Sequence, residues 1–170
     1  MALKIRVHER LNESFNPKIA KIGNQVWMAE NLAIDDGGEG ILYNEQTGHT
    51  YYSYDAACRI VKTLPGWRLP TREDLENLYG KKGEVNNDYG KAWRTEYYGL
   101  GKTLNSALHI PETDHALQFG FKRNHNPAIW VGTLQGLYPR PLVIEIDGSM
   151  AKTWRYGYYD DYVAVRLIKD

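Results

Sequence analysis

Histidine, cysteine and carboxylate side chains are the groups in this sequence that can hold metals or catalyse reactions, and their spacing limits that chemistry. No two histidines are four residues apart, and none lies near the single cysteine, Cys58. Zinc sites need His and Cys ligands at short, regular spacings. We therefore predict surface or hydrogen-bonding histidines and no metal centre; the five are His8, His49, His109, His115 and His125.

Two acidic tracts, residues 35–39 (DDGGE) and 84–88 (EVNND), gather the oxygen atoms that calcium favours. Calcium takes about six to eight oxygen ligands, and neither tract has the spacing of an EF-hand loop. The sequence therefore predicts no bound cofactor.

Cys58 is the one candidate for nucleophilic catalysis. A catalytic thiol needs an adjacent base, and no His–Cys pattern is evident in the sequence. Flanked by Ala57 and Arg59, Cys58 is more typical of a small buried apolar side chain. No nucleophile elbow or phosphate loop occurs either. We predict a non-enzymatic protein; an enzyme that depends on Cys58 is kept as a third hypothesis.

Tyrosine and tryptophan are the unusual feature of the composition, with 13 and 5 residues against 3 phenylalanines. Many of them fall in residues 134–141 (LQGLYPRP) and 153–162 (TWRYGYYDDY), between expected strands. Tyr, Trp and Arg mixed with Gly and Asp are typical of recognition surfaces, although ordinary hairpin tips with exposed rings are an alternative. The predicted ligand-binding residues are Tyr138, Arg140, Arg155, Tyr156, Tyr158, Tyr159, Asp160 and Asp161.

Charge and hydropathy exclude several classes of protein. The 21 basic and 21 acidic residues balance, which argues against nucleic-acid binding through bulk positive charge. No apolar run approaches the roughly 18–20 residues of a membrane helix, and residues 1–17 lack the apolar core of a signal peptide. With one cysteine, no intrachain disulfide forms. Neither an oligomeric state nor a localisation follows from these features.

The first half of the chain predicts an N-terminal arm followed by strands and helices. Residues 1–17 form the arm, and 18–170 form one domain. Residues 18–28 read as two short strands that meet at Gly23 and Asn24, and 33–49 read as a loop. A short helix is expected over 54–62, with Ser53 as its N-cap.

A second helix is expected after Thr71, which begins a capping box with Asp74 in place of Glu. Gly80 supplies its stop. In the proline-rich segment before it, Trp67 and Leu69 are expected to fill the core while Arg68 hydrogen-bonds a loop. Trp27 and Met28 are also expected in the core.

The second half predicts an antiparallel sheet. Residues 91–98 are expected to be helical, and 84–88 an exposed loop. Asp147 and Gly148 form a type I′ turn signal between two of the strands. Helices that precede a main antiparallel sheet indicate an α+β fold. The expected strands are residues 129–133, 142–146, 150–154 and 163–168.

These segments together resemble the Fibrobacter succinogenes major paralogous domain. The resemblance spans residues 21–170, and it implies a C-type lectin-like fold, in which two helices pack on small twisted antiparallel sheets. The matching blocks are residues 21–32 (KIGNQVWMAENL), 51–57 (YYSYDAA), 66–75 (GWRLPTREDL), 119–121 (FGF), 129–133 (IWVGT) and 163–170 (VAVRLIKD).

The chain departs from the family at two places. Members often carry a cysteine where this chain has Thr63 and Leu64, and Trp-Ser-Ser-Thr where it has residues 130–133 (WVGT). The calcium-dependent sugar triads of lectins, Glu-Pro-Asn, Gln-Pro-Asp and Trp-Asn-Asp, do not occur. The resemblance therefore implies function only as a class, binding or display.

The closing blocks also resemble variable proteins of diversity-generating retroelements, where a C-type lectin-like scaffold carries programmed diversity near its C-terminus. Such diversification yields Tyr, Asp, Gly and Arg, and every residue of 155–162 is of a permitted type. Our leading hypothesis is a receptor- or glycan-binding protein of a phage or bacterial surface, diversified in this way. The alternative is a structural or display module of a cell-surface or virion assembly, associated through residues 1–17.

Overall fold

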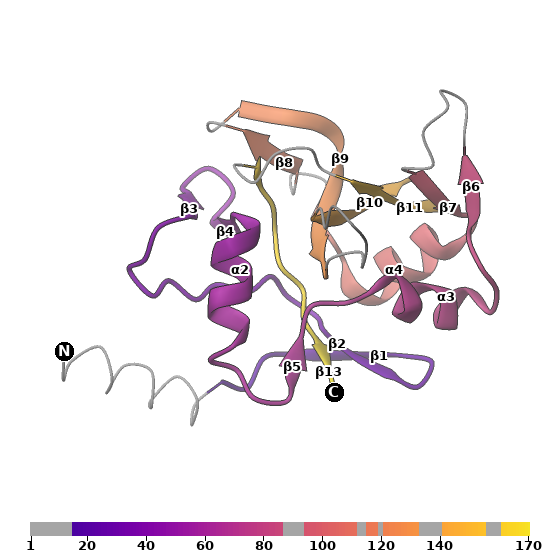
Figure 1. Ribbon diagram of the computed structural model, residues 1–170, viewed down its shortest axis with the longest axis horizontal. Helices are drawn as coiled ribbons and strands as arrows, with labels where there is room; N and C mark the ends of the chain where they lie inside the picture. The colour runs from indigo at the N-terminus through magenta and orange to yellow at the C-terminus, as the bar shows by residue number, and fades with distance from the viewer. Residues whose placement is uncertain (1–14, 87–93, 112–114, 119–120, 133–140, 156–160) are drawn as a thin grey trace, which may run out of the picture.

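Residues 15–86, 94–111, 115–118, 121–132, 141–155 and 161–170 are described by the computed structural model. Within them the chain is a small α+β protein with three helices and antiparallel sheets (Figure 1), which confirms the α+β class, although two helices were expected. The helices are α2 (Tyr54–Val61), α3 (Arg72–Tyr79) and α4 (Leu100–Leu108).

The strands form sheets of four, seven and two strands. The four-stranded sheet has the order β1-β2-β13-β5, with bounds Ile19–Ile22, Gln25–Met28, Ile168–Lys169 and Trp67–Arg68. The seven-stranded sheet has the order β12-β8-β9-β10-β11-β7-β6, with bounds Asp161–Tyr162, His115–Gln118, Phe121–Val131, Leu142–Asp147, Met150–Arg155, Arg94–Tyr97 and Glu84–Asn86. The remaining hairpin pairs β3 (Ile41–Asn44) with β4 (His49–Tyr52).

Strand β10 separates two hydrophobic cores because its side chains alternate between its faces. Leu142, Ile144 and Ile146 point into one core, and Val143 points into the other. The first, the α4 core, lies between the four- and seven-stranded sheets and includes Ile22, Leu75, Leu100, Leu104 and Leu108. The second, the α2 core, includes Ile60, Leu64, Trp130 and Tyr52.

The segment from Val163 to Ile168 was expected to be one strand, and the structure makes it a fully buried connector between sheets instead. It is at most 2% exposed along its length. Val163 bonds to the backbone of Tyr52, whereas the carbonyls of Val165 and Leu167 accept from Leu32 and Met28. Its successive residues form backbone hydrogen bonds with different segments. Only its last part, in β13, therefore joins a regular ladder (Figure 1).

The two predicted helices are confirmed with their caps. The Ser53 hydroxyl accepts from the Ala56 backbone at the start of α2. At α3 both halves of the capping box are present between Thr71 and Asp74, and Gly80 ends the helix in the left-handed region. The hairpin turn at Gly23 and Asn24 is also confirmed.

Several expectations in the middle of the chain are wrong. Residues 33–49 contain strand β3 rather than loop alone, 84–86 are strand β6, and 94–97 are strand β7 rather than helix. Helix α4 was not predicted, although Leu100, Leu104 and Leu108 have helical spacing.

The turn between β10 and β11 lies one residue later than expected. Asp147 pairs with Met150, so Gly148 and Ser149 form the two-residue loop. Gly148 has a φ of 58°, and no positive φ is recorded for Ser149, which fits a type II′ rather than a type I′ turn.

The predicted core residues behave as expected with one exception. Trp27, Met28 and Leu69 are buried, but Trp67 is only partly buried and packs edge-on against Phe15. Residues 1–14 of the expected arm lie outside the described residues.

Candidate functional site

One end of the seven-stranded sheet carries both predicted binding tracts. Leu142 pairs with Val131 on one side and with Arg155 on the other, so three strand ends lie in one row. Strand β9 ends at Val131, β10 begins at Leu142 and β11 ends at Arg155. The tracts of residues 134–141 and 153–162, which were predicted to form one binding face from adjacent loops, are attached to the sheet at this row of strand ends.

Most of the predicted binding residues lie outside the described residues. For Arg155 the structure gives the strand position alone. Asp161 lies elsewhere, in the outer strand β12, where it pairs with Gln118 and is 0% exposed. Because Asp161 is 0% exposed, its side chain does not reach the surface where a receptor could contact it. Those outside the described residues are Tyr138, Arg140, Tyr156, Tyr158, Tyr159 and Asp160.

The proline-rich segment before α3 contacts the backbone next to the end of β9. The backbone N–H of Gly132, next to the end of β9, donates to the carbonyl of Pro70 at 2.8 Å. A Cβ at Gly132 would lie 3.7 Å from that oxygen. The start of the first tract is thus tied to the segment that leads into α3.

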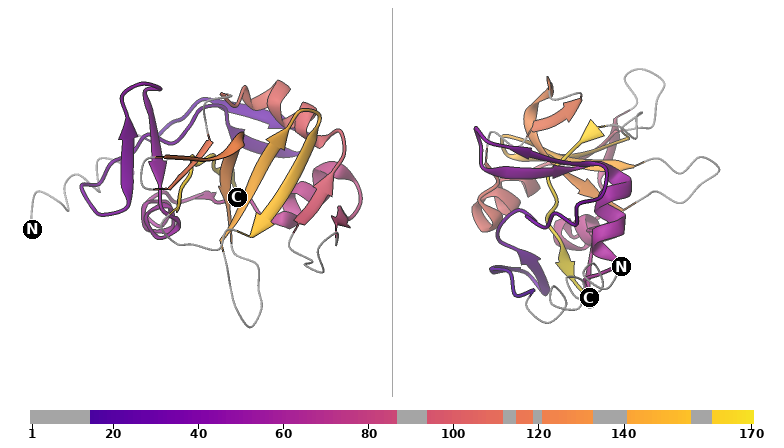
Figure 2. Two further views of the ribbon diagram at one scale, coloured as in Figure 1. Left: turned by 90° about the horizontal axis from the view of Figure 1, so that it is seen from above. Right: turned by 90° about the vertical axis from the view of Figure 1, so that its left-hand side faces the viewer.

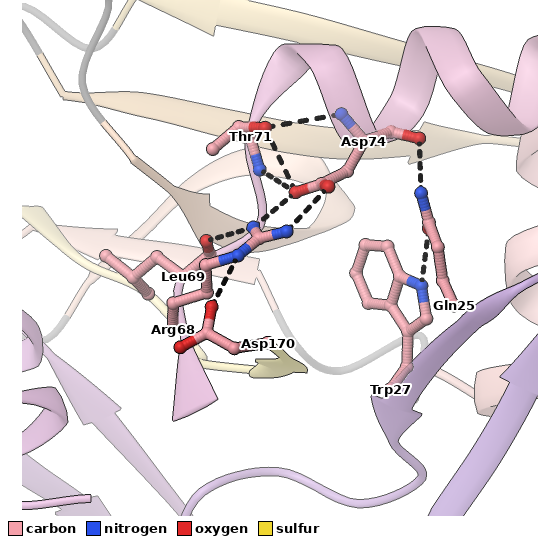
Figure 3. Close-up of polar contacts among 7 residues, drawn as sticks. All are labelled: Gln25, Trp27, Arg68, Leu69, Thr71, Asp74 and Asp170. Atoms are coloured by element: carbon pink, nitrogen blue, oxygen red, sulfur yellow. Dashed lines mark hydrogen bonds and ion pairs between the residues drawn. The ribbon is translucent and has the colours of Figure 1, made fainter. Parts of the chain in front are cut away.

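Arg68 holds the same segment through a polar network (Figure 3). Its two terminal nitrogens donate to the two carboxylate oxygens of Asp74 at 2.6 and 2.8 Å, and its Nε lies 3.0 Å from Asp170 Oδ1. Arg68 was expected to bond a loop, and its main partner is instead in the first turn of α3. We call Arg68, Thr71, Asp74 and Asp170 the Arg68 clasp.

Asp74 is ionised within the clasp over a wide pH range. Burial opposes the charge, but hydrogen bonds from Arg68 and Thr71 outweigh it and lower the pKa of Asp74 below its ordinary value. The backbone carbonyl of Asp74 also accepts from Gln25, whose side-chain oxygen accepts from Trp27 (Figure 3). The clasp therefore connects α3, β5 and β2.

A buried arginine, Arg166, lines a pocket between the first motif and the end of α4. Arg166, 2% exposed, donates to the Leu108 carbonyl at 2.8 Å and to Asn31 Oδ1 at 2.5 Å. Its cation lies at the C-terminus of α4, where the helix dipole favours positive charge. Since these contacts already engage the guanidinium, we assign Arg166 a structural role. The adjoining pocket, about 320 Å³, is lined in part by His49, Thr50, His109 and Glu30.

Cys58 lies half-buried in α2. Burial raises the pKa of the Cys58 thiol, although a hydrogen bond to Tyr54 opposes the change. A thiol with a raised pKa is a poor nucleophile at neutral pH.

The acidic loop of residues 35–39 is fastened by an ion pair. Arg59 Nε lies 2.7 Å from Asp36 Oδ2. The hydrogen bond from Arg59 lowers the pKa of Asp36, despite partial burial. In the described part of the chain, no three His, Cys, Asp or Glu side chains are grouped to hold a metal ion.

No described helix has both the length and the apolar character needed to cross a bilayer. No family model, curated protein or solved structure matched the chain.

Proposed function

We propose that this protein binds a protein or glycan receptor on a cell surface, through the end of the seven-stranded sheet on a C-type lectin-like scaffold. The observation that carries the proposal is the row formed by Val131, Leu142 and Arg155. Two tracts adjoin that row, one with Tyr138 and Arg140 and the other with Arg155 and four tyrosines. Recognition sites commonly combine such side chains on loops held by rigid strands.

The scaffold under the row is well suited to carry variable side chains. Ile129, Val131 and Leu142 are at most 2% exposed, and Gly132 is bonded to Pro70. Side chains of the tracts other than the buried Pro141, Thr153 and Asp161 can therefore change without disturbing this core. The helices α2 and α3 with their antiparallel sheets support the proposed C-type lectin-like arrangement, to which α4 adds a third helix.

The experiment compares the variant in which Tyr156, Tyr158 and Tyr159 are all alanine with the wild type. The probes are a glycan microarray and a panel of intact bacterial cells. Loss of aromatic contacts at a recognition surface costs about 2 kcal/mol or more, so we expect binding to fall about thirtyfold or more. Equal binding by both proteins would contradict the proposal and leave a display module.

Tyr43→Ala is the matched control. Tyr43 is 59% exposed on β3, and Figure 2 places the β3–β4 hairpin at the opposite end of the molecule from β6 and β7. We expect this variant to bind as the wild type does. Equal melting temperatures of all three proteins show that the fold is intact.

Diversification by a retroelement has its own test in the gene. Sequences from sibling clones should vary at Tyr138, Arg140 and residues 155–161. The codons of Trp67, Trp130, Val163, Val165 and Leu167 should stay fixed, and all but Trp67 are 0% exposed. Substitutions spread evenly along the gene, or none, would contradict this part of the proposal.

A further inference from the structure

Four polar side chains meet on one face of β9, β10 and β11, and we call them the Lys152 cluster: Asn126, Glu145, Asp147 and Lys152. The Lys152 ammonium lies 2.6 Å from Asp147 Oδ2 and 4.0 Å from Glu145 Oε1. The side-chain amide of Asn126 donates to the same Glu145 oxygen at 2.7 Å. Glu145 therefore stands between an amine on one neighbouring strand and an amide on the other.

Two members of the cluster, Lys152 and Glu145, are buried, whereas Asn126 and Asp147 are partly exposed. Lys152 is 6% exposed and Glu145 is 8% exposed, and Ala128, which pairs with Glu145, is 1% exposed. Charged groups seldom lie so deep unless they are paired. Exclusion of water also strengthens proton transfer and favours condensation over hydrolysis.

We propose that Lys152 and Asn126 form an intramolecular amide bond, with Glu145 as the proton carrier. The Lys152 ammonium gives one proton to the Glu145 carboxylate, and the neutral Nζ attacks Cγ of Asn126. Glu145 then protonates the departing Nδ2, the Cγ–Nδ2 bond breaks and ammonia leaves, taking up a further proton from Nζ as the net product ammonium. One ammonium is released, and no oxidant or reductant takes part.

The shared oxygen of Glu145 is the geometric basis of this step. One atom contacts the leaving nitrogen and lies near the attacking nitrogen, as a proton carrier must. Nζ has to leave Asp147 and pass Glu145 to reach Cγ, a movement that the flexible four-carbon stem of lysine allows.

Asn126 is a better acyl donor here than Asp147. The Asp147 side chain is 45% exposed, and its ionised carboxylate resists attack by an amine. Asn126 is followed by Pro127, which has no backbone N–H. The usual loss of ammonia by ring closure onto the next residue is therefore blocked at Asn126.

The bond would join β9 to β11 across β10. The closed loop, residues 126–152, contains the whole tract 134–141 and both strand ends that hold it, Val131 and Leu142. Such a link restrains the unfolded chain more strongly than any single ion pair.

The test is the intact mass of the purified full chain after incubation at neutral pH. The wild type should be lighter than its sequence mass by one ammonia. After denaturation, a protease that cuts after glutamate cleaves at Glu145, and the peptides that contain Asn126 and Lys152 should stay joined. Lys152→Arg and Glu145→Gln should each have their full sequence masses, because one lacks the amine and the other the proton carrier.

Lys62→Arg, at an exposed lysine outside the cluster, should keep the loss of ammonia. Circular dichroism shows whether each protein is folded. A folded wild type at full mass would overturn the proposal, and so would loss of water with Lys152 joined to Asp147. Because the readout is mass rather than binding, it is independent of the proposed receptor function.

Discussion

The Arg68 clasp and the Lys152 cluster are built alike, with one cation between two carboxylates. Arg68 contacts Asp74 and Asp170, and Lys152 contacts Asp147 and Glu145. They differ in burial: the Arg68 side chain is 37% exposed, and that of Lys152 is 8% exposed. The more reactive cation is thus the one with less access to water.

The chemistry of the two cations makes this difference informative. A guanidinium stays protonated and binds a carboxylate through two parallel hydrogen bonds, so Arg68 can only hold α3 in place. An amine can lose its proton and become a nucleophile, and Lys152 is the amine from which we propose that a new bond forms. The Arg68 clasp therefore stays non-covalent, whereas we propose that the Lys152 cluster forms a covalent bond.

Asp74→Ala should have the largest effect on stability. It removes the paired hydrogen bonds from Arg68 and half of the capping box of α3. We expect a loss of about 2–4 kcal/mol in the free energy of unfolding, measured by urea denaturation. Glu73→Ala, in the same helical turn, is the control and should cost less than about 1 kcal/mol. Equal losses would show that the clasp contributes nothing beyond helix charge.

Lys152→Met should have the next largest effect. The methionine keeps most of the stem volume but leaves the buried Glu145 without its cation, and the comparison is made with wild-type protein whose intact mass shows that the proposed amide has not formed. A loss of about 1–3 kcal/mol in the same urea experiment follows from an uncompensated buried carboxylate. A variant as stable as the wild type would mean that the cluster holds no net stabilisation.

The pH dependence of the free energy of unfolding should show how much Asp74 of the Arg68 clasp contributes to stability. The pKa of Asp74 is lower in the folded than in the unfolded chain, so its stabilisation is complete above the ordinary aspartate pKa of about 3.9. It is lost as the pH falls from there through the folded value. In urea titrations from pH 6 to pH 3, Asp74→Asn should lose less stability on acidification than the wild type. If both proteins lose the same free energy of unfolding between pH 6 and pH 3, Asp74 does not contribute to the acid sensitivity.

Glu76→Ala should have the smallest effect. The Arg72–Glu76 pair spans one turn of α3 at 3.8 Å, and both side chains are partly exposed. Pairs of this kind contribute about 0.3–0.5 kcal/mol. A loss as large as that of Asp74→Ala would show that the helix, rather than the clasp, determines the stability of this region.

Features that depend on near neighbours in the sequence were predictable. The cap of α3 lies within residues 71–80, and the turn at Gly23 needs only the residues beside it. Helix α4 was obscured by Gly101, a poor helix former, whose added Cβ would collide with the Met150 carbonyl. The leucine spacing in α4 was the signal that could have found it.

Features that depend on strand register were not predictable. The predicted hairpin over 142–154 already placed the two tracts side by side, but the position of the end of β9 in the same row follows only from the pairing of Leu142 with Val131. The Lys152 cluster draws on three strands, and Asn126 and Glu145 are 19 residues apart. A shift of one residue in either pairing would move these side chains to opposite faces.

The buried segment from Val163 to Ile168 has a consequence for biosynthesis. It bonds to Met28, Leu32 and Tyr52, which leave the ribosome long before it, and β13 completes the sheet between β2 and β5. Neither core can close before this segment has been synthesised, so the apolar surfaces of α2 and β10 stay exposed until residues 163–168 have left the ribosome. A nascent chain stalled before Val163 should therefore bind holdase chaperones, and release of these few residues should convert it to a protease-resistant form.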